Sequence, residues 1–318
     1  MFSQTKLTSV IVSTQTKEAQ DKVDGGIDTR IRELVANLKT KTTSLDDQTI
    51  REATSELRRL SKDMENAISI AGCGGISPLV DLLECPDIIT QENAVTSLLN
   101  LSISNNNKIN IVKAESFQPL VHVLQTGTPE ARENAAATLY NLCFSKENKI
   151  RIGSCGAVGP LVELLRCGTH QGKKDAATAL FCLSTCAENR LTIVRSGAVK
   201  HLIDLMNPAT GMVDRAVVVL ANLASNYEGR KAIAEAGGIS LLVEAIELGS
   251  PREKENAAAA LVHFCSESNR YCRKVLEEGA VPSLVILSNS GTSRAKEKAT
   301  RLLRLLRNLQ QLYIAREG

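Results

Sequence analysis

The sequence contains no tryptophan, and aromatic residues make up only 3% of its 318 residues. Aliphatic side chains must therefore fill the core, and Leu, Ala, Val and Ile suit helices whose backbones approach closely. Hydrophobic residues amount to 43% of the chain, which is well above the range of disordered proteins. This composition predicts a folded chain of packed helices.

No run of apolar residues approaches the roughly 18 that are needed to span a bilayer, so we expect no transmembrane segment. The first 28 residues are polar and lack the apolar core of a signal peptide, which predicts a disordered leader over residues 1–28. The nine cysteines are odd in number and scattered, as is typical of reduced thiols. We expect a location in the cytoplasm, the nucleus or both.

The net charge of +3 is small for this length and predicts no nucleic-acid partner. No Ser-His-Asp set or recurring pair of carboxylates is present among the four histidines and scattered acids. Cys167 and His170 form a close pair in the sequence, but zinc requires two further ligands. We therefore expect a protein that is not an enzyme and that uses neither a metal nor a cofactor.

A unit of roughly 41 residues repeats along the chain. Its first mark is a glycine five residues before a leucine that opens an apolar run, and Glu115 replaces the glycine once. Its second mark is a polar residue followed by alanine, which comes about 19 residues after the glycine, or 18 in one copy. The glycines are Gly74, Gly156, Gly197, Gly237 and Gly279, and the alanines are Ala94, Ala135, Ala176, Ala216, Ala257 and Ala299. A degenerate earlier copy, with Glu52 before Ala53, brings the total to about seven.

Each unit is expected to form three helices. Asparagine is a preferred N-cap, so we expect the first helix to begin at a recurring position held by Asn66, Asn107, Asn148, Asn189, Gly229 and Asn269. The recurring glycine should end that helix in the left-handed conformation. A second helix carries Leu161–Leu165 in one copy, and a longer third helix carries Ala135, Leu139 and Leu142 at helical spacing.

This pattern predicts an all-α armadillo-repeat fold, a right-handed superhelical solenoid of about seven three-helix repeats. The expected domains are the leader, an armadillo-repeat domain over residues 29–313 and a tail over 314–318. The repeats are expected to start near residues 29, 67, 108, 149, 190, 230 and 270.

Asparagine recurs near the end of the third helix at Asn100, Asn141 and Asn222, while Cys182, His263 and Leu305 hold this position in other copies. Third helices line the concave groove of armadillo solenoids, where each amide can offer one donor and one acceptor to an extended peptide. Alternatively, each asparagine bonds a neighbouring helix. Both interpretations stay open, and His263 and Tyr140 are expected to add specificity in the groove.

The last helix is expected to present Arg294, Lys298 and Arg301 on one face, because they are spaced at i, i+4 and i+7. Such a face is either the solvated cap of a terminal repeat or a docking surface. The docking surface would take an acidic partner or an anionic membrane, to which the chain would bind peripherally.

Several stretches resemble the armadillo-repeat region of plant U-box ubiquitin ligases, including residues 92–102, 173–180, 211–214, 254–261 and 293–298. The resemblance covers roughly residues 29–310. It implies a scaffold that binds extended peptide segments or kinase and substrate domains. In that family a U-box of about seventy residues lies upstream and recruits the ubiquitin-charged E2 enzyme. Residues 1–28 are too short to hold one, so we expect no ligase activity from this chain alone.

Two alternatives stay open beside the scaffold. The chain is a component or a truncated form of a ubiquitin ligase, or it is a transport or adhesion adaptor. Importin-α armadillo proteins pair each groove asparagine with a tryptophan four residues earlier, and this chain has no tryptophan. That absence disfavours a nuclear-signal receptor.

Overall fold

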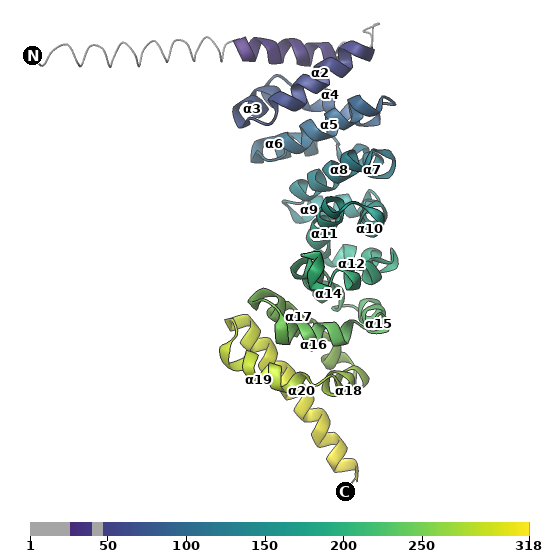
Figure 1. Cartoon of the computed structure of the whole chain (residues 1–318), viewed down its shortest axis with the longest axis vertical. Helices are drawn as coiled ribbons and strands as arrows, with labels where there is room; N and C mark the ends of the chain where they lie inside the picture. The colour runs from purple at the N-terminus through teal and green to yellow at the C-terminus, as the bar shows by residue number, and fades with distance from the viewer. Residues whose placement is uncertain (1–25, 40–46, 318) are drawn as a thin grey trace, which may run out of the picture. The chain divides into compact units, whose positions relative to one another are not determined.

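The computed structural model describes residues 26–39 and 47–317, with side chains up to residue 311 (Figure 1). The chain divides into two compact units, Met1–Leu142 and Cys143–Gly318. Residues 1–25 of the expected leader lie outside the described residues, and residues 26–28 belong to a helix over 26–39. The described residues form helices and turns and no strand, which confirms the all-α prediction.

The first unit stacks one partial and two complete repeats. Its first repeat comprises the helix over 26–39 and the third helix α2 (Asp47–Leu60). The next comprises α3 (Met64–Gly72), α4 (Ile76–Asp81) with the 3-10 turn η1 (Leu82–Glu84), and α5 (Ile88–Leu101). The last comprises α6 (Asn105–Lys113), α7 (Phe117–Thr126) and α8 (Pro129–Leu142). The third helices α2, α5 and α8 pack in sequence, each on the next.

The second unit stacks four repeats. Their first helices are α9 (Lys146–Ser154), α12 (Ala187–Arg195), α15 (Tyr227–Glu235) and α18 (Asn269–Glu277). Their second helices are α10 (Val158–Cys167), α13 (Ala198–Asp204), which η2 (Pro208–Thr210) follows, α16 (Gly238–Leu248) and α19 (Ala280–Ser290). Their third helices are α11 (His170–Ser184), α14 (Val213–Leu223), α17 (Pro251–Glu267) and α20 (Ser293–Glu317), and these again pack in sequence.

An alanine lies near the start of every third helix, directly after the recurring polar residue, and it is buried in each repeat. Because alanine is small, it allows the third helices of adjacent repeats to approach closely. The neighbouring leucines fill the space between the three helices of one repeat, as Leu139 and Leu142 do in α8 with no exposed surface. The alanines are Ala53, Ala94, Ala135, Ala176, Ala216, Ala257 and Ala299.

The recurring glycines end the first helices in the left-handed conformation, as predicted. Gly74, Gly156, Gly197, Gly237 and Gly279 have φ values between 75° and 84°. Glu115 occupies the same position with a φ of 54°, and it is the single non-glycine residue with positive φ among those described. A side chain raises the free energy of this conformation, so this repeat tolerates strain that the others avoid.

The prediction that the recurring asparagines are N-caps was wrong. The caps lie three residues earlier in five of the six repeats, and the side chains of Asp63, Ser145 and Asn226 accept backbone N–H bonds there. Ser268 precedes α18, whose first residue is Asn269. Aspartate, serine and a different asparagine cap these helices, so the preference of asparagine for caps misled the sequence argument.

The recurring asparagines instead lie within the first turn and are buried in three repeats: Asn107, Asn148 and Asn189. The Nδ2 of Asn107 donates to the carbonyl of Ala67, in the first helix of the preceding repeat, at 3.2 Å. The Nδ2 of Asn189 donates to the carbonyls of Lys149 at 2.9 Å and Leu183 at 3.2 Å. These amides therefore join successive repeats rather than starting helices.

Among the described helices, none is by itself long and apolar enough to cross a membrane. One pair, α3 with α4 and η1, meets the length and composition criteria only when it is taken together, and it is bent by 93°.

Candidate protein-binding face

The predicted asparagines of the first unit bond the preceding repeat. Asn100 Nδ2 donates to Ser61 Oγ at 3.0 Å, and Asn141 Nδ2 donates to Ser102 Oγ at 2.8 Å. Each serine follows the end of the preceding third helix and donates its own proton to a carbonyl three residues earlier. Each of these asparagines therefore bonds the end of a neighbouring helix, as the alternative interpretation of the sequence predicted.

These bonds use only part of each amide. Asn100 and Asn141 are half-buried, and their second N–H and their Oδ1 have no partner among the described residues. One donor and one acceptor thus stay available on each asparagine for a partner backbone. The internal bond to serine also holds the amide in one orientation.

The second unit keeps the asparagine in one repeat and replaces it in the other three. Asn222 Nδ2 donates to Ser184 Oγ at 2.9 Å. In the preceding repeat, Cys182 takes the place of the asparagine and Cys143 that of the serine, and the Cys182 thiol donates to the Cys143 carbonyl at 3.7 Å. The hydrogen bond between the thiols lowers the pKa of Cys182 to about 7, and it raises the pKa of Cys143, which is buried.

His263 holds the asparagine position on α17, where Ala224 replaces the serine of the preceding repeat. With no hydroxyl to bond, its side chain is exposed. Partial desolvation lowers the pKa of His263, and the cations Arg230, Arg301, Arg190 and Lys298 lower it further. The imidazole therefore lies among cations that disfavour its protonation.

Tyr140 lies on α8 next to Asn141, with 41% of its surface exposed. The third-helix ends of the first unit also expose Ile103, which follows α5. This part of the surface therefore combines amides with exposed apolar side chains.

The predicted basic face of α20 lies against α17. Arg294 Nη1 is 4.0 Å from Glu255 Oε1, and Arg301 Nη2 donates to Ser266 Oγ at 3.4 Å. Lys298 pairs with the adjacent Glu297 at 3.1 Å. Because Arg301 and Lys298 also act on the pKa of His263, the structure brings the predicted basic face and the predicted groove residue together.

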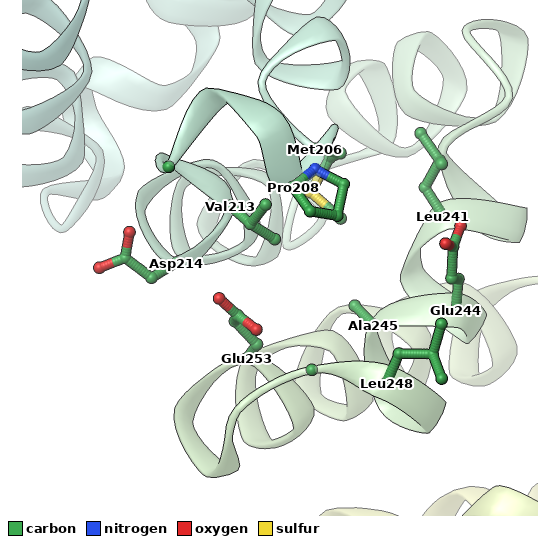
Figure 2. A pocket seen from close by; sticks show the side chains of 11 residues that line it. Met206, Pro208, Val213, Asp214, Leu241, Glu244, Ala245, Leu248 and Glu253 are labelled. Atoms are coloured by element: carbon green, nitrogen blue, oxygen red, sulfur yellow. The ribbon is translucent and has the colours of Figure 1, made fainter.

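Sequence reasoning missed a pocket of 340 Å³ in the second unit (Figure 2). Met206, Pro208 and Leu248 contribute apolar surface, and the carboxylates of Asp214, Glu244 and Glu253 stand around it. The pocket forms where α13 stops early and η2 follows, with Gly211 in the left-handed conformation at φ 64°. The signal in the sequence was the spacing of 18 rather than 19 residues in this copy.

No group of three or more His, Cys, Asp or Glu side chains in the described part of the chain is placed to hold a metal ion. Four of the nine cysteines are buried in the second unit, at Cys143, Cys186, Cys265 and Cys272. Cys167 is exposed and its thiol contacts Glu163 rather than His170.

The model of the plant U-box protein ARM repeat region matches residues 30–312. The chain belongs to this armadillo-repeat family. U-box domain-containing protein 4 of Arabidopsis thaliana is 68% identical over 268 residues, which are 84% of this chain and 32% of that protein. U-box domain-containing protein 14 of the same plant is 47% identical over 100 residues, or 31% of this chain and 16% of that protein. This armadillo chain thus spans about a third or less of the length of these relatives.

Solved structures agree with the armadillo fold. An engineered protein matches 87% of this armadillo chain, over 68% of its own length, with a TM-score of 0.73 and 29% identity. A designed armadillo repeat protein in complex with the peptide (KR)4 matches 73% of this chain, over 99% of its own length, with a TM-score of 0.63 and 25% identity. The armadillo-repeat prediction is therefore confirmed.

Proposed function

We propose that the chain is a non-catalytic scaffold that binds partner or substrate proteins through a groove lined by its third helices. The observation that carries the proposal is the half-used amide of Asn100 and Asn141, repeated at one pitch along the first unit. An extended peptide has backbone donors and acceptors at regular intervals, which suits such a series of amides. The designed armadillo protein that binds (KR)4 supports a peptide as the ligand class.

The partners that we propose are extended segments of proteins or kinase and substrate domains, in the cytoplasm, the nucleus or both. Asn222 and His263 would contribute in the second unit, and Tyr140 would contribute apolar contact in the first.

The experiment must separate binding from the internal hydrogen bonds. Asn100→Ala/Asn141→Ala removes the amides, whereas Ser61→Ala/Ser102→Ala removes only their internal partners and leaves the amides in place. Asn106→Ala/Asn110→Ala on the exposed side of α6 is a matched control. Affinity for a partner recovered by pull-down is measured for all three variants, together with thermal stability.

If the amides bind the partner, only the first variant loses affinity, by about tenfold or more. Equal losses of thermal stability in the asparagine and serine variants, with affinity unchanged in both, would show that these residues serve the fold alone.

A second candidate is a role in ubiquitin transfer, because the relatives are named for a U-box. We propose that this chain supplies recognition and that a U-box acts from elsewhere. Incubation of the chain with E1, a panel of E2 enzymes and ubiquitin should then give no ubiquitin chains, and robust autoubiquitination would contradict the proposal. A transport or adhesion adaptor is a third candidate, which the absence of tryptophan disfavours.

A further inference from the structure

A series of cations follows the third-helix ends of the second unit. Lys149 Nζ donates to Thr185 Oγ1 at 3.1 Å, and Arg190 Nη1 donates to Ser225 Oγ at 2.8 Å. Both hydroxyls lie just past the end of a third helix, after α11 and after α14. Arg301 Nη2 reaches the hydroxyl of Ser266 near the end of α17 in the same way, from the neighbouring helix α20.

Helix C-termini carry partial negative charge, and arginine is well suited to bond their free carbonyls. Arg190 donates to the carbonyls of Ser184 at 2.9 Å and Thr185 at 3.3 Å, and Arg230 donates to the carbonyl of Ala224 at 2.9 Å. These bonds fix the guanidinium groups beside the third-helix ends and remove part of the entropy that a flexible side chain would lose on binding.

The positive charges in this series are only partly compensated. Arg230 lies 3.8 Å from Glu267, Arg294 lies 4.0 Å from Glu255, and Lys298 pairs with Glu297. The hydrogen bonds of Lys149, Arg190 and Arg301 all go to neutral oxygens. The carboxylate of Glu188 is close enough to Arg190 for their charges to interact, so Arg190 is compensated in part. Desolvation is the largest cause of the lowered pKa of His263, and the charged groups that lower it further are all cations.

We propose that the third-helix ends of the second unit form a docking surface for an acidic, extended segment of a partner protein. This surface consists of Lys149, Arg190, His263, Lys298 and Arg301, while Arg230 is buried and adds its charge rather than a contact. The inference rests on the proposed scaffold function and names the partner class for one unit. Charge complementarity selects the occupant, since the surface presents several fixed cations to any segment that follows the third helices. A basic peptide such as (KR)4 would be repelled.

The test uses the whole chain and three labelled octapeptides: alternating Asp and Glu, (KR)4, and a neutral Ser-Gly peptide. Fluorescence anisotropy at low and at physiological salt gives the affinities. The acidic peptide should bind at least about tenfold more tightly than the others, and more weakly as salt rises. Equal binding of the neutral or the basic peptide would overturn the inference and leave the scaffold proposal standing, because that proposal is tested on Asn100 and Asn141.

Two variants locate the site. Lys298→Gln/Arg301→Gln removes one half-buried and one exposed cation of α20, and Arg190→Gln removes the cation that bonds the ends of α11 and α14. Each variant should lower the affinity for the acidic peptide about three- to tenfold. The matched control is Arg166→Gln/Lys200→Gln, which removes two charges from the second helices α10 and α13. Should Arg190→Gln fail to fold, the α20 variant decides alone.

An equal effect of the control would show a non-specific charge attraction and overturn the proposed site. The competing occupant is an anionic membrane, so the same variants are sedimented with phosphatidylserine vesicles. Vesicle binding that needs Lys298 and Arg301, without binding of the acidic peptide, would also overturn the inference.

Discussion

The two units build the same repeat but finish their third helices with different side chains. In the first unit the ends carry the amides Asn100 and Asn141 on serine hydroxyls, with exposed Tyr140 and Ile103 nearby. The second unit keeps one such amide, Asn222 on Ser184, and otherwise has cations held on hydroxyls and carbonyls in this region. The core alanines and leucines are equivalent in both.

This difference shows where a repeat protein can change without losing its fold. Side chains between helices are constrained by packing, because a change of one methylene is felt in a dense core. Side chains at the third-helix ends need only keep a local hydrogen bond, so an Asn–Ser, a Cys–Cys or an Arg–Ser pair can do so. Each unit can therefore present its own recognition chemistry on one backbone.

Substitution of the buried asparagines in the first helices should give the largest difference in stability between the two units. Asn189→Ala leaves two carbonyls without their side-chain donor, and Asn107→Ala leaves one. We expect losses of about 2–3 kcal/mol and about 1–2 kcal/mol in the free energy of unfolding. Urea unfolding measures the totals, and hydrogen exchange by mass spectrometry assigns each loss to its unit. Equal losses would show that the second bond of Asn189 contributes nothing.

Substitution of the residue that ends the first helix should change the free energy of unfolding in opposite directions in the two units. Gly156→Ala places a side chain at φ 84°, in space that holds no other atom, so strain alone should cost about 1–2 kcal/mol. Glu115→Gly relieves a similar conformation at φ 54° and should stabilise the first unit by about 1 kcal/mol.

Thermal unfolding of these two variants measures both signs. Glu115 takes part in further interactions, so Glu115→Asn is the companion variant, because asparagine tolerates this conformation and retains a polar side chain. A loss of stability in both Glu115 variants would show that its contacts outweigh the strain.

The cysteine pair of the second unit can be converted to the Asn–Ser pair of the first. Cys143→Ser/Cys182→Asn should be more stable than the sum of the single variants predicts, by about 1 kcal/mol, because only the double variant restores an amide-to-hydroxyl bond. A double-mutant cycle in urea measures this coupling. Simple additivity would mean that the helix ends lie too far apart to form the bond.

The smallest expected difference is in the response to acid. The Arg51 guanidinium lowers the pKa of Asp87 in the first unit to about 2, with help from Thr90. The folded state therefore binds fewer protons than the unfolded one, and this stabilisation is present above the ordinary pKa near 4 and is lost as the pH falls toward 2.

In the second unit the pKa of His263 is also lowered, so protonation favours unfolding once the pH falls below the ordinary value near 6.5. Between pH 7 and 5 the second unit should therefore lose stability while the first keeps it. Unfolding temperatures across this range, with His263→Gln as the variant that removes the slope, measure the effect. An unchanged slope in that variant would assign it to another group.

Much of the fold could be predicted from the sequence, because residues with the same structural role recur in each repeat. The left-handed glycines, the buried alanines and leucines, and the three-helix unit all follow from residues that recur at one spacing. The helix starts did not follow, because serine, aspartate and asparagine all cap well and only the three-dimensional course of the chain selects among them. Asn189 was therefore given a local role when its partners lie in other helices.

By itself, the sequence determined the family, the repeat and which residues of each repeat are equivalent, since these depend on spacing and on side-chain size. Only the tertiary structure decided what the equivalent residues do. The amides of Asn100 and Asn141 meet serines that are 39 residues away in the chain. The cations of the second unit are likewise fixed by hydroxyls about 36 residues away. Contacts at such separations arise from stacking, because a helical repeat brings together positions that no local pattern connects.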